Sequence, residues 1–400
     1  MKEKFALRME GFGSDIVEKM FAVALDPEII SFAGGAPAPE LYPMEAFRQA
    51  SDAAFEEYGR TMVAYDGAAG IAGLREFIAS ERMSAFGVDA SANDITITSG
   101  SQQGADYAAR VFVNEGDTII VEAPSYLGTI NTFSAFKPNF VTVDMDEEGM
   151  IMEELEAAIA ANPDAKLIYT VPDYQNPTGI TMSVERRKRL VEIATAAGIP
   201  VVEDAPYADI SFEGERMPAV KSFDTEGVVI YLGSFSKIVS PGLRLGWACA
   251  HPDILFKYRK LKEATDLQSS TITQYQLLKF LQTNDLEAHI NTLVDAYRQK
   301  RDAILEALEQ HMPDFVSFTH PKGGFFTWLR VPGVDATELF VKACTEAKVA
   351  YVPGEGAFVN GQGKDTIRLS YSQMSPEKIK EGIPRLAALI REAREKQAAA

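Results

Sequence analysis

The sequence is short of cysteine, histidine, tryptophan and positive charge. Its 400 residues include only two cysteines, four histidines and two tryptophans. Cys249 and Cys344 supply neither a disulfide framework nor the spacing of a metal site, so we expect no metal ion. The 39 basic and 57 acidic residues leave a net charge of −18, which disfavours nucleic acid and anionic membranes as main partners. A local basic pocket for a small anionic ligand is still compatible with such an acidic chain.

Long apolar runs are also missing. No run is long enough to span a bilayer, and the N-terminus lacks a hydrophobic signal segment. A hydrophobic content of 46% and a charged content of 24% are ordinary for a soluble globular protein. We therefore expect a cytoplasmic protein, long enough for two domains, whose partners are small molecules.

The chain does contain an alternation of apolar strands and helices, which is typical of an α/β protein with a mainly parallel sheet. A polar or aromatic cluster follows each expected strand. The strands are expected over residues 94–98, 118–122, 166–171, 199–203 and 228–232. Because the carboxyl ends of parallel strands meet at one edge of a sheet, we expect these clusters to lie together.

The stretch after the last of these strands is the most informative. Lys237 lies among small hydroxyl residues, and Arg244 follows seven positions later. Burying a charged lysine without an acid costs folding free energy. That cost is avoided when its amine forms a neutral Schiff base, which also serves catalysis. Ser234, Ser236 and Arg244 can supply hydroxyl donors and a forked cation for a phosphate. Lysine with a phosphate cup favours pyridoxal 5′-phosphate (PLP), although an ordinary Ser-Lys loop is the alternative.

The other strand ends offer the remaining services that this cofactor needs. Asp204 is a candidate to keep the pyridine nitrogen protonated, or alternatively caps a helix. Tyr207 and Asn176 can donate to the phenolate oxygen. Tyr126 can cover the ring, or is a core aromatic. In the turn before a helix expected over residues 105–113, Ser101 and Gln102 can donate to the phosphate. Simple N-capping by a serine is the alternative.

These pieces together resemble a class I/II aminotransferase of the PLP-dependent superfamily called fold type I. The resemblance rests on the order and spacing of residues 99–103, 176–179, 204–207 and 234–237 with Arg244, and it runs from residue 31 to residue 371. It implies a mainly parallel seven-stranded sheet in a large domain, residues 45–295. It also implies a smaller α+β domain from residues 1–44 and 296–400, with an N-terminal substrate-covering segment that includes a helix over residues 14–25.

The resemblance also assigns roles that spacing cannot give. Arg368 matches the arginine that binds the substrate α-carboxylate, and Gly35 matches a glycine whose backbone meets the same group. Asn176 matches a residue that contacts both cofactor and substrate, and its bond to Pro177 is expected to be cis. Tyr65 matches a tyrosine that reaches the neighbouring cofactor phosphate, which implies a homodimer. Lys237, Asp204 and Tyr207 would be the catalytic residues.

The implied reaction is a ping-pong transfer of an amino group from an L-α-amino acid to a 2-oxo acid, with 2-oxoglutarate expected as acceptor and a Lys237 Schiff base. The chain is most similar to the 2-aminoadipate and kynurenine aminotransferase group, through residues 31–40 and 122–126. One aminoadipate branch carries an arginine where this chain has Val17, so we expect broad specificity for aminoadipate, aromatic or aliphatic donors. Arg8 could replace the missing arginine from another turn.

Two rival readings have other functions. A PLP-dependent β-lyase on the same fold would release ammonia and need no acceptor. A non-enzymatic PLP-binding regulator would carry a DNA-binding module before this domain. We expect no room for such a module, because the aminotransferase-like pattern begins by about residue 14, and the net charge also disfavours it.

Overall fold

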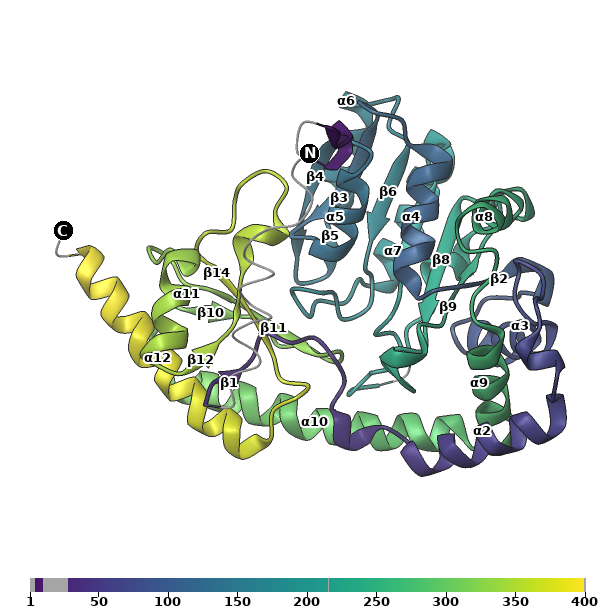
Figure 1. Ribbon diagram of the computed structural model, residues 1–400. Coiled ribbons are helices and arrows are strands. Elements are labelled where there is room, and N and C mark those ends of the chain that lie inside the picture. The colour runs from purple at the N-terminus through teal and green to yellow at the C-terminus, as the bar shows by residue number, and fades with distance from the viewer. Residues whose placement is uncertain (1–3, 10–27, 215, 399–400) are drawn as a thin grey trace.

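A computed structural model describes residues 4–9, 28–214 and 216–398 of the chain. A large sheet with helices on both faces forms one part of the molecule, and a small sheet forms the other (Figure 1). Val17 and the helix expected over residues 14–25 lie outside the described residues. No helix among the described residues is long and apolar enough to cross a membrane.

The large sheet has eight strands in the order β2-β9-β8-β7-β6-β3-β4-β5. Six of them, β2, β3, β4, β6, β7 and β8, run in the same direction, whereas β9, which lies between β2 and β8, and β5, which pairs with β4, run in the opposite direction. The strands are β2 (Ile95–Thr98), β3 (Thr118–Ala123), β4 (Asn139–Asp146), β5 (Gly149–Met150), β6 (Leu167–Thr170), β7 (Val201–Asp204), β8 (Val229–Ser234) and β9 (Gly246–Cys249). The eighth strand beyond the expected seven is the two-residue β5 at the edge.

Helices lie between most of the strands of the large sheet, and three consecutive helices, α8, α9 and α10, follow its last strand. The helices are α2 (Met44–Tyr58), α3 (Ala72–Phe77), α4 (Ser101–Phe112), α5 (Leu127–Ser134), α6 (Met152–Ala161), α7 (Val184–Ala197), α8 (Pro252–Thr265), α9 (Thr271–Thr283), α10 (Leu286–His311), α11 (Ala336–Thr345) and α12 (Pro376–Ala398). Helix α4 begins four residues earlier than expected, at Ser101, and this difference bears on the site.

Alternate residues of the parallel strands pack against different helices. Ile119 and Val121 of β3 pack with α4, α5 and α8, which cover what we call the front face of the sheet. Ile120 of the same strand packs with α6 and α7, which cover the back face. Successive residues of a strand point to opposite faces, and helices cover both faces of this sheet. The strands are therefore nearly continuous apolar runs, as expected for a parallel sheet buried on both sides.

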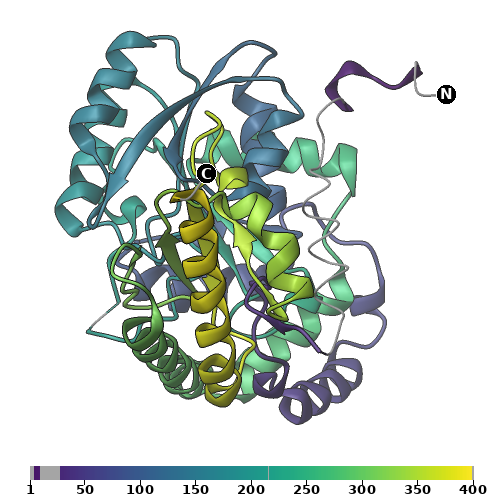
Figure 2. The same ribbon diagram turned by 90° about the vertical axis from the view of Figure 1, so that its left-hand side faces the viewer.

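The small part of the molecule contains a four-stranded antiparallel sheet, β10-β11-β14-β13, and a parallel pair, β1-β12. Figure 2 shows α11 and α12 beside these strands. Helix α10 packs on α12, and it runs along the lower side of Figure 1 beneath both parts as one continuous helix. The strands are β1 (Ile30–Ser31), β10 (Ser317–Phe318), β11 (Phe326–Arg330), β12 (Val349–Ala350), β13 (Val352–Pro353) and β14 (Thr366–Ser370).

The fold brings the polar clusters to one edge of the large sheet. Strands β3, β6, β7 and β8 run parallel and end next to one another, at Ala123, Thr170, Asp204 and Ser234. Strand β14 of the small sheet adds Arg368 from the opposite side. The segments that follow these strand ends therefore face the small part of the molecule.

Candidate functional site

Two cavities meet at the carboxyl edge of the large sheet. The smaller, of about 150 Å³, is lined by all the residues that we predicted to bind the cofactor except Tyr65. The larger, of about 360 Å³, is lined by Gly35, Asn176 and Arg368, the residues predicted to bind the substrate. Both cavities are lined by Tyr126, Asn176, Tyr207 and Lys237. The predicted residues thus form one site with two chambers. They lie at the ends of six strands or in the segments that follow them, together with Arg368 within β14.

Lys237 lies where the two cavities join. Its amine donates a hydrogen bond to the backbone carbonyl of Gly35 at 2.9 Å and lies 5.5 Å from the centre of the Tyr207 ring. Burial, followed by the charges of Arg368 and Arg244, lowers the pKa of this amine to about 8, against the opposite effect of Asp204. Such an amine holds its proton weakly enough to act as both nucleophile and base near neutral pH.

Asp204 ends β7 on the front face and points into the smaller cavity. Its Oδ2 accepts a hydrogen bond of 2.9 Å from the hydroxyl of Tyr169, whereas its buried Oδ1 has no hydrogen-bond partner among the described residues. Burial raises the pKa of this carboxyl to about 6, although the nearby hydroxyls of Tyr169 and Ser101 and the charge of Lys237 pull it down. A buried acceptor left open in this way is suited to a cationic N–H donor of a ligand.

The first turn of α4 forms the floor of a cup for an anion. The helix begins at Ser101 after Gly100, and no side chain caps it, so the predicted alternative of N-capping by a serine does not hold. Gly246 lets this turn pack onto β9, because a Cβ there would lie 2.6 Å from the carbonyl of Gly233 and 2.9 Å from the nitrogen of Ser101. Free N–H groups at a helix start attract anions.

Hydroxyls and a cation complete this cup. Ser234 ends β8, and its hydroxyl accepts a hydrogen bond of 3.1 Å from the backbone of Ser236. Arg244 lies in the left-handed region with φ 52°, and its guanidinium donates to the carbonyl of Ser99 at 3.3 Å. This bond holds the arginine over the start of α4, beside the serines.

Gln102 and Tyr126 are held together on the front side of the smaller cavity. The Gln102 amide donates to the carbonyl of Gly128 at 2.9 Å and to the hydroxyl of Thr132, so its polar end is bonded to α5. The half-buried ring of Tyr126 passes close over Gly128, where a Cβ would lie 2.5 Å from the ring. Tyr126 lines both cavities, which supports the ring-covering interpretation over that of a core aromatic.

Asn176 and Tyr207 lie between the chambers. The Asn176–Pro177 bond is cis, as predicted. Tyr207 is buried, and its ring meets those of Phe325 and Phe326 edge to face at 5.6 Å. Burial raises the pKa of the Tyr207 hydroxyl far above its ordinary value, so it stays a hydrogen-bond donor.

Arg368 is a buried cation bonded to neutral groups. It donates to Oδ1 of Asn176 at 2.8 Å and to the carbonyl of Ala33 at 2.6 Å, and its Nε has no partner in the part of the chain that the structure describes. The guanidinium lies 4.6 Å from the centre of the Phe326 ring. No carboxylate among the described residues pairs with it, and burial lowers its pKa to about 10. A small carboxylate entering the larger cavity would meet an unpaired fork.

Tyr65 lies apart from both cavities. It follows a short helical turn, Thr61–Val63, and its side chain is 84% exposed. Arg8 lies in the turn Leu7–Met9, is exposed, and lines neither cavity. These two residues therefore take no part in the site that one chain builds by itself.

Sequence reasoning missed several residues of the site. Tyr169 was read only as part of an apolar strand, although every second residue of that strand faces the same side as Asp204. Phe326 lies under Arg368, and Trp328 and Leu127 line the larger cavity. The parity of the strands could have found Tyr169, whereas the other three come from parts of the fold that no local pattern brings together.

Comparison with known proteins agrees with this geometry. The family model described as aminotransferase class I and II matches residues 28–386. Aromatic-amino-acid aminotransferase 1 of Thermococcus litoralis is 39% identical over 97% of this chain and 94% of its own, and 2-aminoadipate transaminase of Thermus thermophilus is 38% identical over 94% and 93%. A crystal structure of Pyrococcus horikoshii kynurenine aminotransferase in complex with PMP superposes with a TM-score of 0.94, at 38% identity over 98% of both chains. This chain therefore belongs to the class I and II aminotransferase family and is an aminotransferase that depends on pyridoxal 5′-phosphate.

Proposed function

We propose that this protein transfers the amino group of an L-α-amino acid to 2-oxoglutarate in a ping-pong reaction, with Lys237 as the residue that binds the cofactor covalently. The observation that supports this most is the arrangement of Lys237, Asp204 and Arg368 around two joined cavities. These residues supply three functional groups to the cavities. They are the Lys237 amine of lowered pKa, the unbonded Oδ1 of Asp204 and the buried Arg368 guanidinium without a carboxylate partner among the described residues.

The residues of the smaller cavity fit PLP. The open Oδ1 of Asp204 would face the pyridinium nitrogen, and the start of α4, Ser234, Ser236 and Arg244 would hold the phosphate. Tyr126 would cover the ring, and Tyr207 with Asn176 would donate to its phenolate oxygen. The bound cofactor supplies an electron sink for the carbon that loses its proton.

The chain's own residues then perform the remaining work. Arg368 binds the α-carboxylate of the amino acid and fixes the orientation of its Cα. Lys237, whose amine has a pKa of about 8, removes the Cα proton and returns it elsewhere on the bound molecule. Because Arg368 keeps the α-carboxylate in place, loss of carbon dioxide is disfavoured.

We propose a broad range of amino donors. Leu127, Trp328 and Val352 line the larger cavity, and its cations among the described residues are Lys237 and Arg368 alone. These apolar walls suit aliphatic and aromatic side chains, and Asn131 offers one amide for a polar end. The two curated relatives above act, by their names, on aromatic amino acids and on aminoadipate, which supports breadth.

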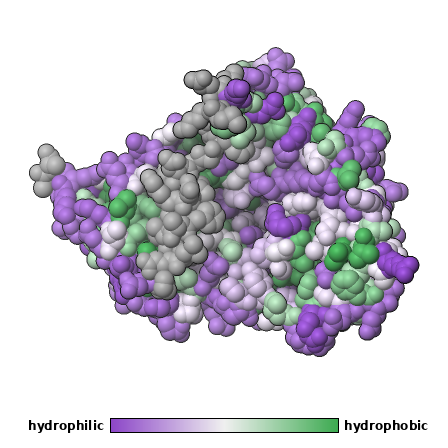
Figure 3. All heavy atoms as spheres, in the orientation of Figure 1, coloured by the Kyte–Doolittle hydropathy of each residue, from purple (hydrophilic) through white to green (hydrophobic). Residues whose placement is uncertain are grey.

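We further propose a homodimer in which Tyr65 reaches the partner's site. Figure 3 shows hydrophobic side chains gathered where Figure 1 draws α2, α3 and α9. Val63 and Tyr65, which follow α2, and Leu267, which lies between α8 and α9, are each more than half exposed, and the backbone of Asp66 is bonded to Gln268. Mixing a Tyr65→Ala chain with a Lys237→Ala chain tests this, because only an exchange of subunits would restore one complete site. No recovered activity after exchange would contradict the proposal.

The direct test is a panel of amino donors with 2-oxoglutarate, on the PLP-loaded protein and on Lys237→Ala. We expect activity with several donors, a fall of about 10⁴-fold in the variant, and no turnover without an acceptor. Ammonia released from an amino acid without an acceptor would favour the β-lyase alternative. Lys237→Ala with near-normal turnover would refute the assignment of this lysine.

A further inference from the structure

Glu122 is a fully buried carboxylate for which the described residues provide no cation. It lies near the end of β3 on the back face and is 1% exposed. Its oxygens accept from the hydroxyl of Thr170 at 2.5 Å, from the backbone of Val171 at 3.2 Å and from the amide of Gln175 at 2.7 Å. A buried carboxylate held only by neutral donors costs folding free energy that an apolar residue would not cost.

Gln175 connects this carboxylate to two separate loops. Its amide nitrogen donates to Glu122 and, at 2.9 Å, to the carbonyl of Pro124. Its amide oxygen accepts from the hydroxyl of Thr178 at 2.6 Å. Gln175 is completely buried, so these bonds are shielded from water. One side chain thus joins the loop after β3 to the loop after β6.

Both loops carry residues of the site. Pro124 lies two positions before Tyr126, which lines the cofactor cavity, and Gln175 directly precedes Asn176. Asn176 in turn accepts from Arg368 at 2.8 Å. Glu122 and Gln175 therefore connect the segment that carries Tyr126 to the Asn176–Arg368 pair.

We propose that Glu122 and Gln175 are positioning residues that fix Tyr126 and Asn176 relative to each other. This inference rests on the proposed function, because it concerns the ring-covering tyrosine and the contact to the substrate-binding arginine. Neither Glu122 nor Gln175 lines the cofactor or substrate cavity, so they act through the two loops and not by touching substrate.

The test compares Glu122→Leu, Gln175→Met and Glu122→Gln. Leucine removes the acceptor of the Val171 N–H and one of the acceptors of the Gln175 amide nitrogen, so we expect a rise of about ten- to hundredfold in KM for the amino donor and a weaker circular dichroism band of bound PLP. Glutamine can accept from the same two nitrogens and donate to Thr170, so Glu122→Gln should stay within about threefold of the parent. If Glu122→Leu does not fold, Gln175→Met carries the test with the same expected change.

Glu203→Leu is the matched control. Glu203 lies on the same back face one strand further on, is completely buried, and accepts from the backbone of Val220 and Lys221 at 2.7 and 2.8 Å. The turn it holds, Val220–Phe223, carries no residue of the site. We expect Glu203→Leu to lower thermal stability as Glu122→Leu does, with an unchanged dichroism band and KM.

The outcomes separate the inference from the proposed function. If the parent protein shows no dichroism band when PLP is added, the proposed function itself fails. If the parent binds PLP and folded Glu122→Leu or Gln175→Met matches it in KM and dichroism, the inference alone is wrong. A loss in Glu122→Gln as large as that in Glu122→Leu would also overturn it, because charge and not hydrogen bonding would then be decisive.

Discussion

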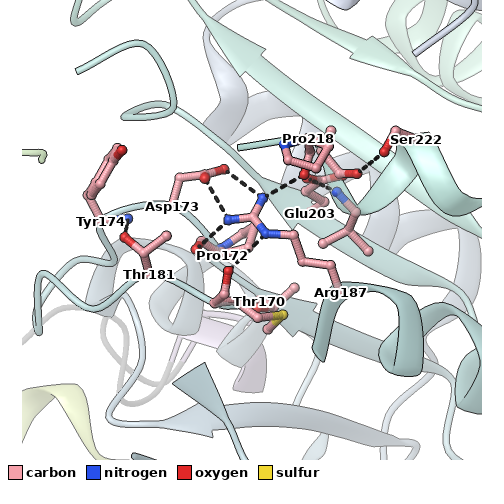
Figure 4. Close-up of polar contacts among 12 residues, drawn as sticks. Thr170, Pro172, Asp173, Tyr174, Thr181, Arg187, Glu203, Pro218 and Ser222 are labelled. Carbon is pink, nitrogen blue, oxygen red and sulfur yellow. Dashed lines mark hydrogen bonds and ion pairs between the residues drawn. The ribbon is translucent and has the colours of Figure 1, made fainter. Parts of the chain in front are cut away.

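Two polar clusters near the carboxyl edge of the large sheet differ in how completely their groups are bonded. On the back face, Arg187 of α7 is fully buried and uses all five of its N–H groups, on Asp173 and on the carbonyls of Pro172, Met182 and Pro218 (Figure 4). Arg368 of β14 faces the cavities from the small sheet, and among the described residues its Nε has no partner and its guanidinium pairs with no carboxylate. The fully bonded Arg187 stabilises the fold, whereas the incompletely bonded Arg368 is available to bind a ligand.

The carboxylates of β7 repeat this contrast in adjacent residues. Glu203 points to the back face, where each oxygen accepts a backbone N–H. Asp204 points to the front, where Oδ1 has no hydrogen-bond partner in the described ranges of the chain. Because neighbouring residues of a strand face opposite sides, one strand end supplies both a structural and a functional carboxylate. Burial of a polar group thus does not by itself indicate a function. A buried polar atom without a hydrogen-bond partner does indicate one.

The largest expected effect compares the two arginines. Arg187→Leu leaves Asp173 as a buried, unpaired charge, so we expect it to lower the free energy of unfolding by about 3–5 kcal/mol. Arg368→Leu removes a cation that lacks an anion, so the apoenzyme should lose less than about 1 kcal/mol, while KM for the amino donor rises. Chemical denaturation and steady-state kinetics measure the two quantities. Equal destabilisation by both substitutions would remove the distinction between the clusters.

Much of this arrangement could be predicted from sequence, because the strand ends are local signals. The apolar run before Asp204 and the one before Ser234 give strands β7 and β8, and the clusters after them point to one edge. Strand β4 was missed because Thr142, Asp144 and Asp146 interrupt its apolar residues on a half-exposed edge. Strand β9 was missed because it begins with Gly246, a residue type that is depleted in strands.

The bonding state of the site residues could not be predicted. Whether Asp204 and Arg368 keep open valences depends on which groups distant segments bring beside them, such as Tyr169 and Ala33. Gln102 shows the same limit, since its amide is bonded to Gly128 of α5. Local sequence places a residue near the edge, and packing decides what remains free for a ligand.

The second prediction uses the pH dependence of apoenzyme stability. Burial raises the pKa of Asp204 to about 6, above its ordinary value of 3.8, so the folded state binds the proton more tightly than the unfolded state. The contribution of Asp204 to stability therefore falls as pH rises from about 4 to about 6. Asp204→Asn removes this penalty and should gain on the parent by up to about 3 kcal/mol between pH 4 and pH 8, while it loses activity about 10²-fold or more.

Glu203→Gln is the control for that experiment. Burial raises the pKa of Glu203 to about 7, so its substitution should also change the pH dependence of stability. However, Glu203 faces the back of the sheet, and we expect turnover and the absorption of bound PLP to stay as in the parent. Denaturation curves across the pH range, with activity at pH 8, distinguish the two carboxylates. A Glu203→Gln enzyme as inactive as Asp204→Asn would contradict the assignment by face.

The smallest expected effect concerns the hydrogen bond that Asp204 accepts from Tyr169. Tyr169→Phe removes the donor to Oδ2, which raises the pKa of Asp204 further and weakens its hold on a cationic ring nitrogen. We expect kcat/KM to fall about five- to thirtyfold, which corresponds to about 1–2 kcal/mol. Tyr107→Phe is the matched change, because that buried hydroxyl lies on the same face and bonds only to Thr265, which is not part of the site. If both substitutions reduce kcat/KM alike, Tyr169 acts through packing, and its hydrogen bond to Asp204 does not contribute to activity.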